Sequence, residues 1–381
     1  MGDVEQSATP ILDSGILPQR HRRGIRPKAL GGALLIGVVL MEILALLGGL
    51  WHEHWPAIFL ALFILAITIH EVGHLVAGWV VGFHFSSIQV GPLMLENEYG
   101  VLRSRLSFDM MAFGSAGMYA NGVRKLRRRS IVYIAGGPAA NLLTVVVVVL
   151  VSYLIPSTSS SGLATAAGQL AAISLLLAMI SLVPITSNDG AIIEMLLFSP
   201  FSARRYISTV ALGSQFNQGI RAGLWKQTWV KAATYIPDKS HNEFYASWMA
   251  YLFANDRKNG ALAAQYLERC LEITPSLTTM FRDLVAQEAV VFISWFKTDP
   301  TLAEKWLLQV KQRRSLPQLL QVRIEVALHC SRRDFDSALG AWEKGCGLVD
   351  KTPVKPSNAS LRESWLEWRS EIQERQAQMT A

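Results

Sequence analysis

The sequence predicts a mainly α-helical protein: a polytopic membrane bundle of about four spanning helices with a small β-hairpin, followed by a repeat-like cytosolic helical domain. Three observations support this fold class. Hydrophobic residues make up 51% of the 381-residue chain and are concentrated before residue 200. Most charged residues follow that position, and from about Ser240 onward the apolar residues recur with a helical period. The length allows two or three domains.

These composition changes divide the chain into four parts. We expect a basic tail over residues 1–28, a membrane-embedded domain over 29–199, an interfacial linker over 200–239 and a cytosolic helical domain over 240–381. The linker carries Trp225 and Trp229 one helical turn apart, beside several basic residues. Such a segment can lie on the membrane surface. It could equally be the first helix of the cytosolic domain.

Four apolar stretches are long enough to cross a bilayer as helices, which takes roughly 20 residues. The first could instead be a signal peptide, although it has no clear small-residue cleavage site and a second span follows at once. The fourth could instead be a buried helix of a soluble protein. The stretches are about Leu30 to Leu50, Pro56 to Val81, Ile131 to Ile155 and Leu163 to Val183.

The segments between these stretches alternate in their content of Lys and Arg. The N-terminal tail, the loop before the third span and the segment after the fourth are basic, whereas residues 51–55 and 156–162 contain no Lys or Arg. Because basic loops stay in the cytosol, both termini of this integral, multi-pass protein are expected there. We expect it in a bacterial cell membrane. No nucleic-acid-binding motif accompanies the basic residues, so we expect no nucleic-acid partner.

The second stretch contains His70, Glu71 and His74. Ionisable residues inside a membrane are costly, which marks these three as a candidate functional site. Histidines at positions i and i+4 share one helix face and can bind one metal ion. The intervening glutamate can act as general base for a water molecule that the metal activates. The alternative is a chance motif on a buried helix, which leaves Glu71 without an explanation.

A catalytic zinc ion usually has a third protein ligand. Asp189 lies just past the cytosolic end of the fourth stretch. The second and fourth helices run in the same direction, so Asp189 and the histidines lie at matching depth. Pro184 ends or bends the helix, and Gly190 permits an unusual backbone beside the ligand. The alternative is that Asp189 caps the next apolar stretch, Ala191 to Phe198.

Three motifs together resemble those of the site-2 proteases, which are zinc metalloproteases that cut substrates within the membrane. The resemblance covers residues 56 to about 200. It implies a zinc cofactor held by His70, His74 and Asp189, and Glu71 as the catalytic acid and base. The motifs are His70-Glu71-x-x-His74, Gly136-Gly137-Pro138-Ala139-Ala140-Asn141, and Pro184 to Gly190.

The same resemblance implies residues that position the substrate. Asn141 matches a family asparagine close to the active site, where it would orient the substrate or the tetrahedral intermediate; the alternative is a hydrogen bond between helices. Pro184 and Ser181 are further candidates of this kind. The chain departs from the family pattern at Ser181, where an asparagine is usual, and at Asn188, where a leucine is common.

The segment from Phe85 to Ser107 alternates in part between apolar and polar residues, with a polar turn at Glu96 to Gly100. This pattern predicts a β-hairpin beside the active site. An exposed sheet edge can bind a substrate as an added strand. The hairpin could instead only seal the site from water.

In the C-terminal half, three apolar groups recur at intervals that suit helical-hairpin repeats. They resemble degenerate tetratricopeptide repeats, which bind peptides or partner proteins, so a cytosolic protein partner is a further expectation. The alternative is a helical cap without a partner. The groups are Ala263, Tyr266, Leu267 and Cys270; Ala303, Trp306 and Leu307; and Ala338, Leu339 and Trp342.

The sequence therefore predicts an intramembrane zinc endopeptidase that cuts membrane-protein substrates in or near their transmembrane segments. The rival interpretation is a proteolytically silent, membrane-anchored scaffold whose helical domain recruits partner proteins. An intact Glu71 favours the protease, because a silent relative has no need to retain the base.

Overall fold

The computed structural model describes residues 10–19, 55–98, 101–106, 114–154, 162–184, 188–277, 279–311, 318–350 and 356–380. The chain forms two compact units. The membrane unit comprises residues 23–207, and the helical unit comprises residues 208–381 together with the N-terminal residues up to 22. The boundary lies within one helix, α7 (Pro200–Asn217).

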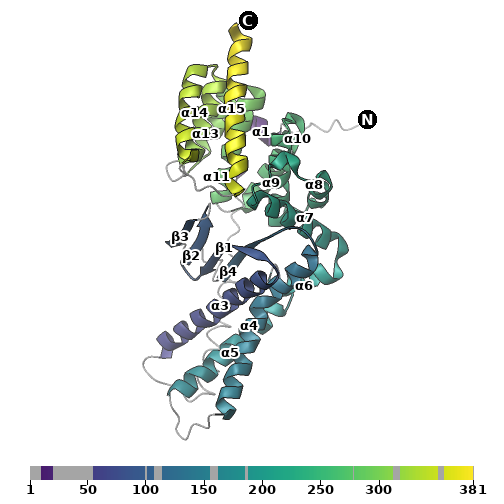
Figure 1. Ribbon diagram of the computed structural model, residues 1–381, viewed down its shortest axis with the longest axis vertical. Coiled ribbons are helices and arrows are strands. Elements are labelled where there is room, and N and C mark those ends of the chain that lie inside the picture. The colour runs from purple at the N-terminus through teal and green to yellow at the C-terminus, as the bar shows by residue number, and fades with distance from the viewer. Residues whose placement is uncertain are drawn as a thin grey trace, which may run out of the picture. The chain divides into compact units, whose positions relative to one another are not determined.

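Three helices of the membrane unit are long and apolar enough to cross a membrane (Figure 1). They are α3 (Trp55–Val80), α4 (Leu126–Leu154) and α5 (Gly162–Leu182). Their positions agree with the second, third and fourth predicted apolar stretches, although α4 begins five residues earlier than predicted and includes three basic residues. The predicted first span, about Leu30 to Leu50, lies outside the described residues. The next helix, α6 (Asp189–Phe198), confirms the apolar stretch that was expected after Asp189.

Glycines allow α3 and α4 to approach closely. A Cβ atom at Gly73 would lie 2.4 Å from the carbonyl oxygen of Gly136, and one at Gly136 would lie 2.5 Å from the carbonyl oxygen of Gly73. Only residues without a side chain fit such a crossing. The opposite faces of these helices expose large apolar side chains, such as Leu60, Leu143 and Leu150. Extended apolar surfaces of this kind mark contact with a membrane or another protein.

The predicted β-hairpin is part of a larger, four-stranded antiparallel sheet in the order β3-β2-β1-β4. The hairpin prediction was wrong in two respects. The strand β2 continues to Glu98, through part of the expected turn, and β4 was not predicted. The sequence of β4, GSAGMYA, contains no β-branched residue, and Tyr119 is its one residue of high strand propensity. The strands are β1 (Phe83–Val90), β2 (Leu93–Glu98), β3 (Val101–Leu106) and β4 (Gly114–Ala120).

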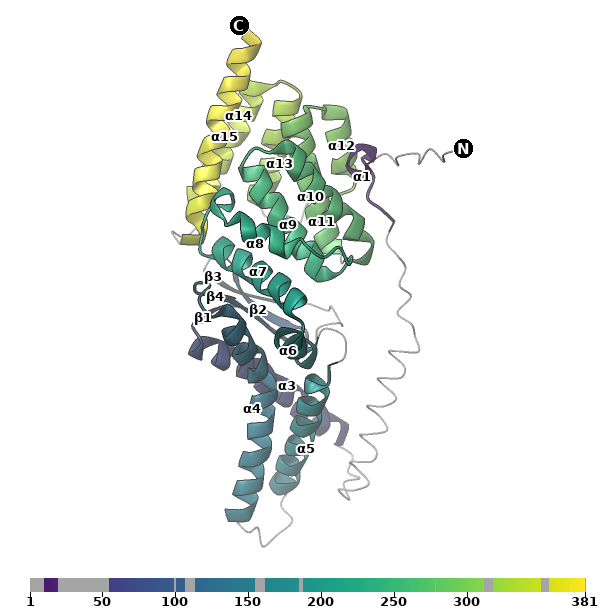
Figure 2. The ribbon, with the colours of Figure 1, turned by 90° about the vertical axis from the view of Figure 1, so that its right-hand side faces the viewer.

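The helical unit is built mainly from consecutive helices that pack as neighbours (Figure 2). The α-helices after α7 are α8 (Gln227–Ala233), α9 (His241–Asp256), α10 (Gly260–Ile273), α11 (Thr279–Phe292), α12 (Pro300–Leu308), α13 (Gln318–Ser331), α14 (Phe335–Asp350) and α15 (Pro356–Thr380). The short elements are the 3₁₀ helices Ala222–Leu224 and Thr274–Ser276 and the π-helical turn Ile293–Lys297.

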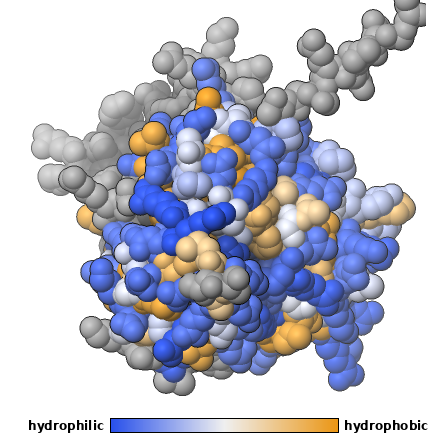
Figure 3. Space-filling model, turned by 90° about the horizontal axis from the view of Figure 1, so that it is seen from above, coloured by the Kyte–Doolittle hydropathy of each residue, from blue (hydrophilic) through white to orange (hydrophobic). Residues whose placement is uncertain are grey.

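The recurring apolar groups of the C-terminal half supply its core. Ala263, Leu267, Ala303, Trp306 and Ala338 are completely buried. The surface seen from the C-terminal end of α15 is mainly hydrophilic (Figure 3), as expected of a face in contact with water. The repeat character itself stays a prediction, because the helices of the unit differ in length.

The expected linker over residues 200–239 is divided between the two units. Trp225 is 2% exposed and packs with Leu212, Val230 and Phe253 in one apolar cluster. Its indole nitrogen donates a hydrogen bond to the carbonyl of Ile220. This placement favours the second interpretation of the segment, as the start of the helical unit.

Part of the expected N-terminal tail also belongs to the helical unit. Residues 10–19 include a one-turn helix, α1 (Ile11–Ser14), which packs against α10. Leu12 and Leu17 are members of the main apolar cluster of the unit. Leu12 and Glu268, which are joined by a hydrogen bond, lie 256 positions apart in the sequence.

Candidate metal centre

Two histidines of α3 point from one helix face toward α4. His70 and His74 are separated by one helical turn, and their rings lie 4.9 Å apart in an edge-on arrangement. Both are largely enclosed, with side-chain exposures of 12% and 8%. The expectation that positions i and i+4 of this motif share a face is therefore confirmed.

Asp189 reaches the histidines from the first turn of α6. Its neighbour Asn188 caps that helix: the Asn188 side-chain oxygen accepts a hydrogen bond from the amide of Ala191 at 3.0 Å. The Asn188 amide nitrogen donates to the carbonyl oxygens of Ile180 and Val183, which joins the end of α5 to the start of α6. Because Asn188 is the cap, the Asp189 carboxylate is free to face the histidines.

The three side chains form a group that could hold a metal ion, with donor atoms within 4.8 Å of one another. Asp189 Oδ2 lies 3.0 Å from His70 Nε2 and 3.5 Å from His74 Nε2. Ligand atoms around a tetrahedral zinc ion lie about 3.4 Å apart, since each bond is about 2.0–2.2 Å long. Both distances are close to that value.

The second ring nitrogens are held by α4. His74 Nδ1 lies 3.0 Å from the carbonyl oxygen of Tyr133, which can only accept a hydrogen bond, so Nδ1 carries the proton. The amide of Gly137 also approaches Nδ1, at 3.3 Å. We assign the proton from the shorter contact, because the ordinary helical partner of the Gly137 amide is the same Tyr133 carbonyl. His74 Nε2 is then a metal-binding lone pair, or carries a second proton as a cation.

Asn141 of α4 supports the other histidine. It is completely buried, and its side-chain amide lies 3.2 Å from His70 Nδ1. Its amide oxygen is buried with no hydrogen-bond partner among the described residues. Exchanging the oxygen and nitrogen, which are equivalent in shape, gives the oxygen a proton donor in His70 Nδ1–H. His70 Nε2 is then free for a metal, as in metal sites generally, where a neighbouring group fixes the histidine tautomer.

Gly137 leaves the space that an ion needs. A Cβ atom at this position would lie 2.4 Å from His74 Nε2 and 2.6 Å from His70 Nε2. These distances exceed a zinc–nitrogen bond by only about 0.5 Å. Any side chain at residue 137 would therefore compete for the space beside the two nitrogens, and the donor set and this cradle both fit zinc.

Glu71 lies beside the sheet and is close enough to the donor group to interact electrostatically with His70, His74 and Asp189. It follows His70 directly and is 6% exposed. A Cβ atom at Gly114, the first residue of β4, would lie 2.3 Å from Glu71 Oε1. The β4 backbone therefore passes directly over this carboxylate, next to the metal-binding group.

The remaining predicted site residues lie around the end of α5. The Ser181 hydroxyl donates to the carbonyl of Ala178 in its own helix, at 3.1 Å. Pro184 is exposed just past that helix. No described contact joins either residue to the donor group. Their predicted role in substrate positioning stays a prediction.

Two tyrosines that the sequence did not single out lie near the centre. Besides meeting His74 through its carbonyl, Tyr133 donates a hydrogen bond from its hydroxyl to the carbonyl of Ala116 in β4. Burial and then the charge of Asp189 raise the pKa of Tyr206, in α7, to about 12. It is therefore neutral near pH 7. Both residues are recognisable only from tertiary contacts.

Asp189 is ionised at neutral pH. Burial alone would raise the pKa of its carboxyl group, but hydrogen bonds with His70 and His74 outweigh burial and hold the pKa below its usual value. A carboxylate is the form that binds a divalent cation.

Comparisons of the chain with protein-family models, curated proteins and solved structures gave no match.

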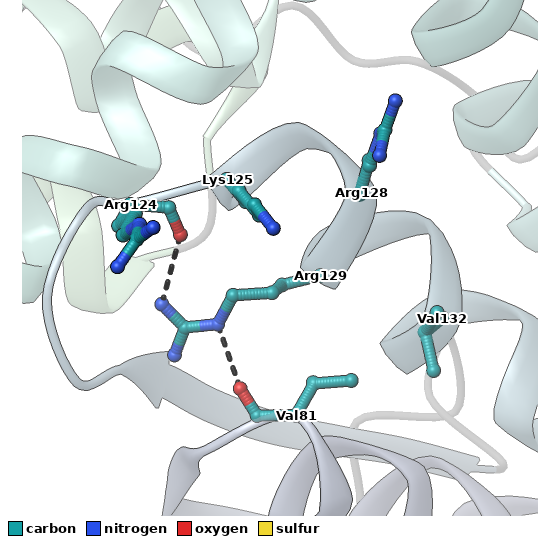
Figure 4. Close-up of a pocket in the computed structure, with 6 residues that line it drawn as sticks. All are labelled: Val81, Arg124, Lys125, Arg128, Arg129 and Val132. Carbon is teal, nitrogen blue, oxygen red and sulfur yellow. Dashed lines mark hydrogen bonds between the residues drawn. The ribbon is translucent and has the colours of Figure 1, made fainter.

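A basic cavity of about 500 Å³ lies at the start of α4, before the residues of that helix that contact the histidines (Figure 4). Arg129 donates hydrogen bonds to the carbonyls of Val81 and Arg124, among others. None of the described residues that line the cavity is acidic. Its lining residues are Val81, Arg124, Lys125, Arg128, Arg129 and Val132.

Proposed function

We propose that this protein is an intramembrane zinc metalloprotease of the site-2 type, which hydrolyses peptide bonds in or near the transmembrane segments of other membrane proteins. The observation that carries the proposal is the group of His70, His74 and Asp189 inside apolar helices, with Glu71 beside it. Gly137 lies only about 9 Å along α4 from Ile131, where the apolar part of that helix begins. A hydrolytic centre at this depth would serve substrates that are themselves in the membrane.

His70, His74 and Asp189 would hold the zinc ion. Bound there, zinc would supply Lewis-acid activation of the scissile carbonyl group and of the attacking water. Glu71 would take the proton of that water and deliver it to the leaving amine. Asn141 and the Tyr133 carbonyl would keep each histidine in the tautomer that presents Nε2.

The sheet would hold the substrate. β4 is an edge strand that begins next to Glu71, and an edge strand can accept an extended peptide as a neighbour. A substrate paired with β4 near Gly114 would present its backbone to the carboxylate. Gly114→Ala would place a methyl group between β4 and Glu71, so we expect it to lower cleavage at unchanged zinc content. Unchanged cleavage by this variant would contradict the substrate arrangement.

Both ends of the chain would lie in the cytosol. Residues 10–19 pack on the helical unit, so they share its side of the membrane. The described residues between them and that unit contain three candidate spans, an odd number. This topology would require a further crossing between Gln19 and Trp55, and the apolar stretch from about Leu30 to Leu50 is the proposed one. Under this topology a cysteine at Ser159 is labelled by an impermeant reagent in intact cells, whereas protection of that cysteine would exclude the topology.

The function is tested by cleavage of a model membrane substrate by the purified protein in lipid. We expect cleavage that stops when a zinc chelator is added and returns when zinc is restored. The rival function, a silent scaffold, predicts no cleavage either with or without zinc. Failure of the zinc-loaded protein to cut any of a panel of single-span substrates would favour the scaffold.

A further inference from the structure

Residues 10–19 bind to the helical unit in the manner of a peptide ligand. The surface that holds them, here called the docking surface, consists of Glu268, Arg282, Lys297, Trp306 and Gln309, which come from α10, α11, α12 and the turns beside them. Only two side chains of the segment are fully enclosed, Leu12 at 2% and Leu17 at 7% exposure. Ile16, between them, is 62% exposed.

The docking surface recognises the main chain of the segment. The Glu268 carboxylate accepts hydrogen bonds from the amides of Ile11 and Leu12, at 2.5 and 2.9 Å. The buried indole nitrogen of Trp306 donates to the carbonyl of Leu12 at 2.9 Å. These contacts hold both the amide and the carbonyl of Leu12, in the first turn of the segment.

The extended part of the segment is held in the same way. Arg282 donates to the carbonyl of Pro18 at 2.7 Å, and the Gln309 side chain accepts a longer hydrogen bond from the amide of Leu17, at 3.4 Å. Five main-chain groups are thus met by four side chains of the unit. Recognition of main-chain groups, with pockets for a few side chains, is the usual way in which proteins bind peptides.

Two further contacts restrict which sequences fit. Gly15 has a left-handed backbone with φ of +70°, and a Cβ atom there would lie 2.9 Å from the Cβ of Lys305. Asp13 pairs with Lys297. The fitting pattern is therefore apolar–apolar–acidic–any–Gly–any–apolar, as in residues 11–17.

We propose that the docking surface is a peptide-recognition site, that residues 10–19 are its resident ligand, and that a partner protein carrying a segment of the same pattern exchanges with it. Displacement would release the helical unit from the chain that leads into the membrane unit. The proposal does not depend on the metal centre or on proteolysis.

Covalent connection explains how a short ligand can occupy the site and still be exchangeable. Tethered ligands experience local concentrations on the order of 1 mM. A segment with a dissociation constant of about 10 µM would then occupy its site about 99% of the time. A free peptide at about 10 µM would not displace it from the wild-type chain, so the site must be emptied to be measured.

The test uses the full-length protein in detergent and a fluorescent peptide of residues 8–20. In the variant Leu12→Ser/Leu17→Ser the resident segment loses both enclosed side chains. We expect this variant to keep its helical circular dichroism and to bind the peptide saturably, at least 10-fold more tightly than wild type does. A peptide carrying the same two serines is the control and should not bind.

A second pair of variants locates the binding. In the emptied protein, Glu268→Gln should weaken peptide binding at least 10-fold. A neutral amide replaces the charged carboxylate, and its single oxygen is a weaker acceptor for the two main-chain amides. Glu272→Gln, an exposed position one turn further along α10, should leave binding unchanged. If the emptied protein stays folded but binds no peptide, the recognition site is refuted. If it loses its helical structure, the segment is part of the core and the recognition site is likewise refuted.

Discussion

Gly137 offers a test of the metal centre that spares every ligand. In Gly137→Ala, His70, His74, Asp189 and Glu71 all remain. The new methyl group would lie 2.4 and 2.6 Å from the two Nε2 atoms, where side-chain carbons keep at least 3.0 Å. At least one histidine must therefore move by about 0.6 Å, the difference between 3.0 and 2.4 Å.

This displacement is large for a metal site. Ligand distances in functional sites stay within about 0.2 Å of their ordinary values. Changes that only disturb the support of a ligand already cost about 10- to 100-fold in metal affinity. We therefore expect Gly137→Ala to lower zinc affinity by at least about 100-fold. Helix stability should not fall for local reasons, because alanine is favoured over glycine in a helix by about 1 kcal/mol.

The assay is zinc per chain by mass spectrometry, followed by chelator competition for the affinity, with thermal unfolding as the measure of folding. Gly168→Ala is the matched control: Gly168 lies in α5, and a Cβ atom there would meet nothing within 4 Å. It should keep wild-type zinc. Wild-type zinc affinity in Gly137→Ala would refute a metal position between the two Nε2 atoms.

Three further predictions concern the third ligand and the residues around the ligands. Asn141→Leu keeps the volume but removes the acceptor for His70 Nδ1–H, so zinc affinity should fall about 10- to 100-fold in the same competition assay; an unchanged value would show that the amide only joins helices. Asp189→Ala should lose zinc and cleavage together. Asn188→Ala should keep the zinc ligand but lose the cap of α6, which lowers stability by about 1 kcal/mol. Zinc content and the melting temperature measure these two effects. Zinc loss in Asn188→Ala with retention in Asp189→Ala would mean that the third ligand is misassigned.

The parts of this fold that follow from local sequence were predictable. The apolar length of α3 and the spacing of its two histidines are contained within 26 residues. Asp189 was reached by a longer inference, from its depth relative to those histidines. Its rival interpretation as a helix cap is settled by Asn188, whose side chain takes that role.

The parts that depend on tertiary contacts were not predictable. The role of Gly137 arises only where α4 crosses α3, and Tyr133 acts through its backbone carbonyl, which leaves no mark in the sequence. β4 contains no β-branched residue, and it is paired with β1 and packed beside α3. The docking of Leu12 on the helical unit joins residues more than 250 positions apart.

The most direct test of the central claim is zinc content and substrate cleavage measured together for wild type, Glu71→Gln and His74→Ala. Glu71 is assigned as the base and not as a ligand, so Glu71→Gln should hold close to one zinc ion per chain and cleave nothing. His74→Ala should lose both. Retained cleavage in Glu71→Gln, or zinc loss in it equal to that of His74→Ala, would contradict the account.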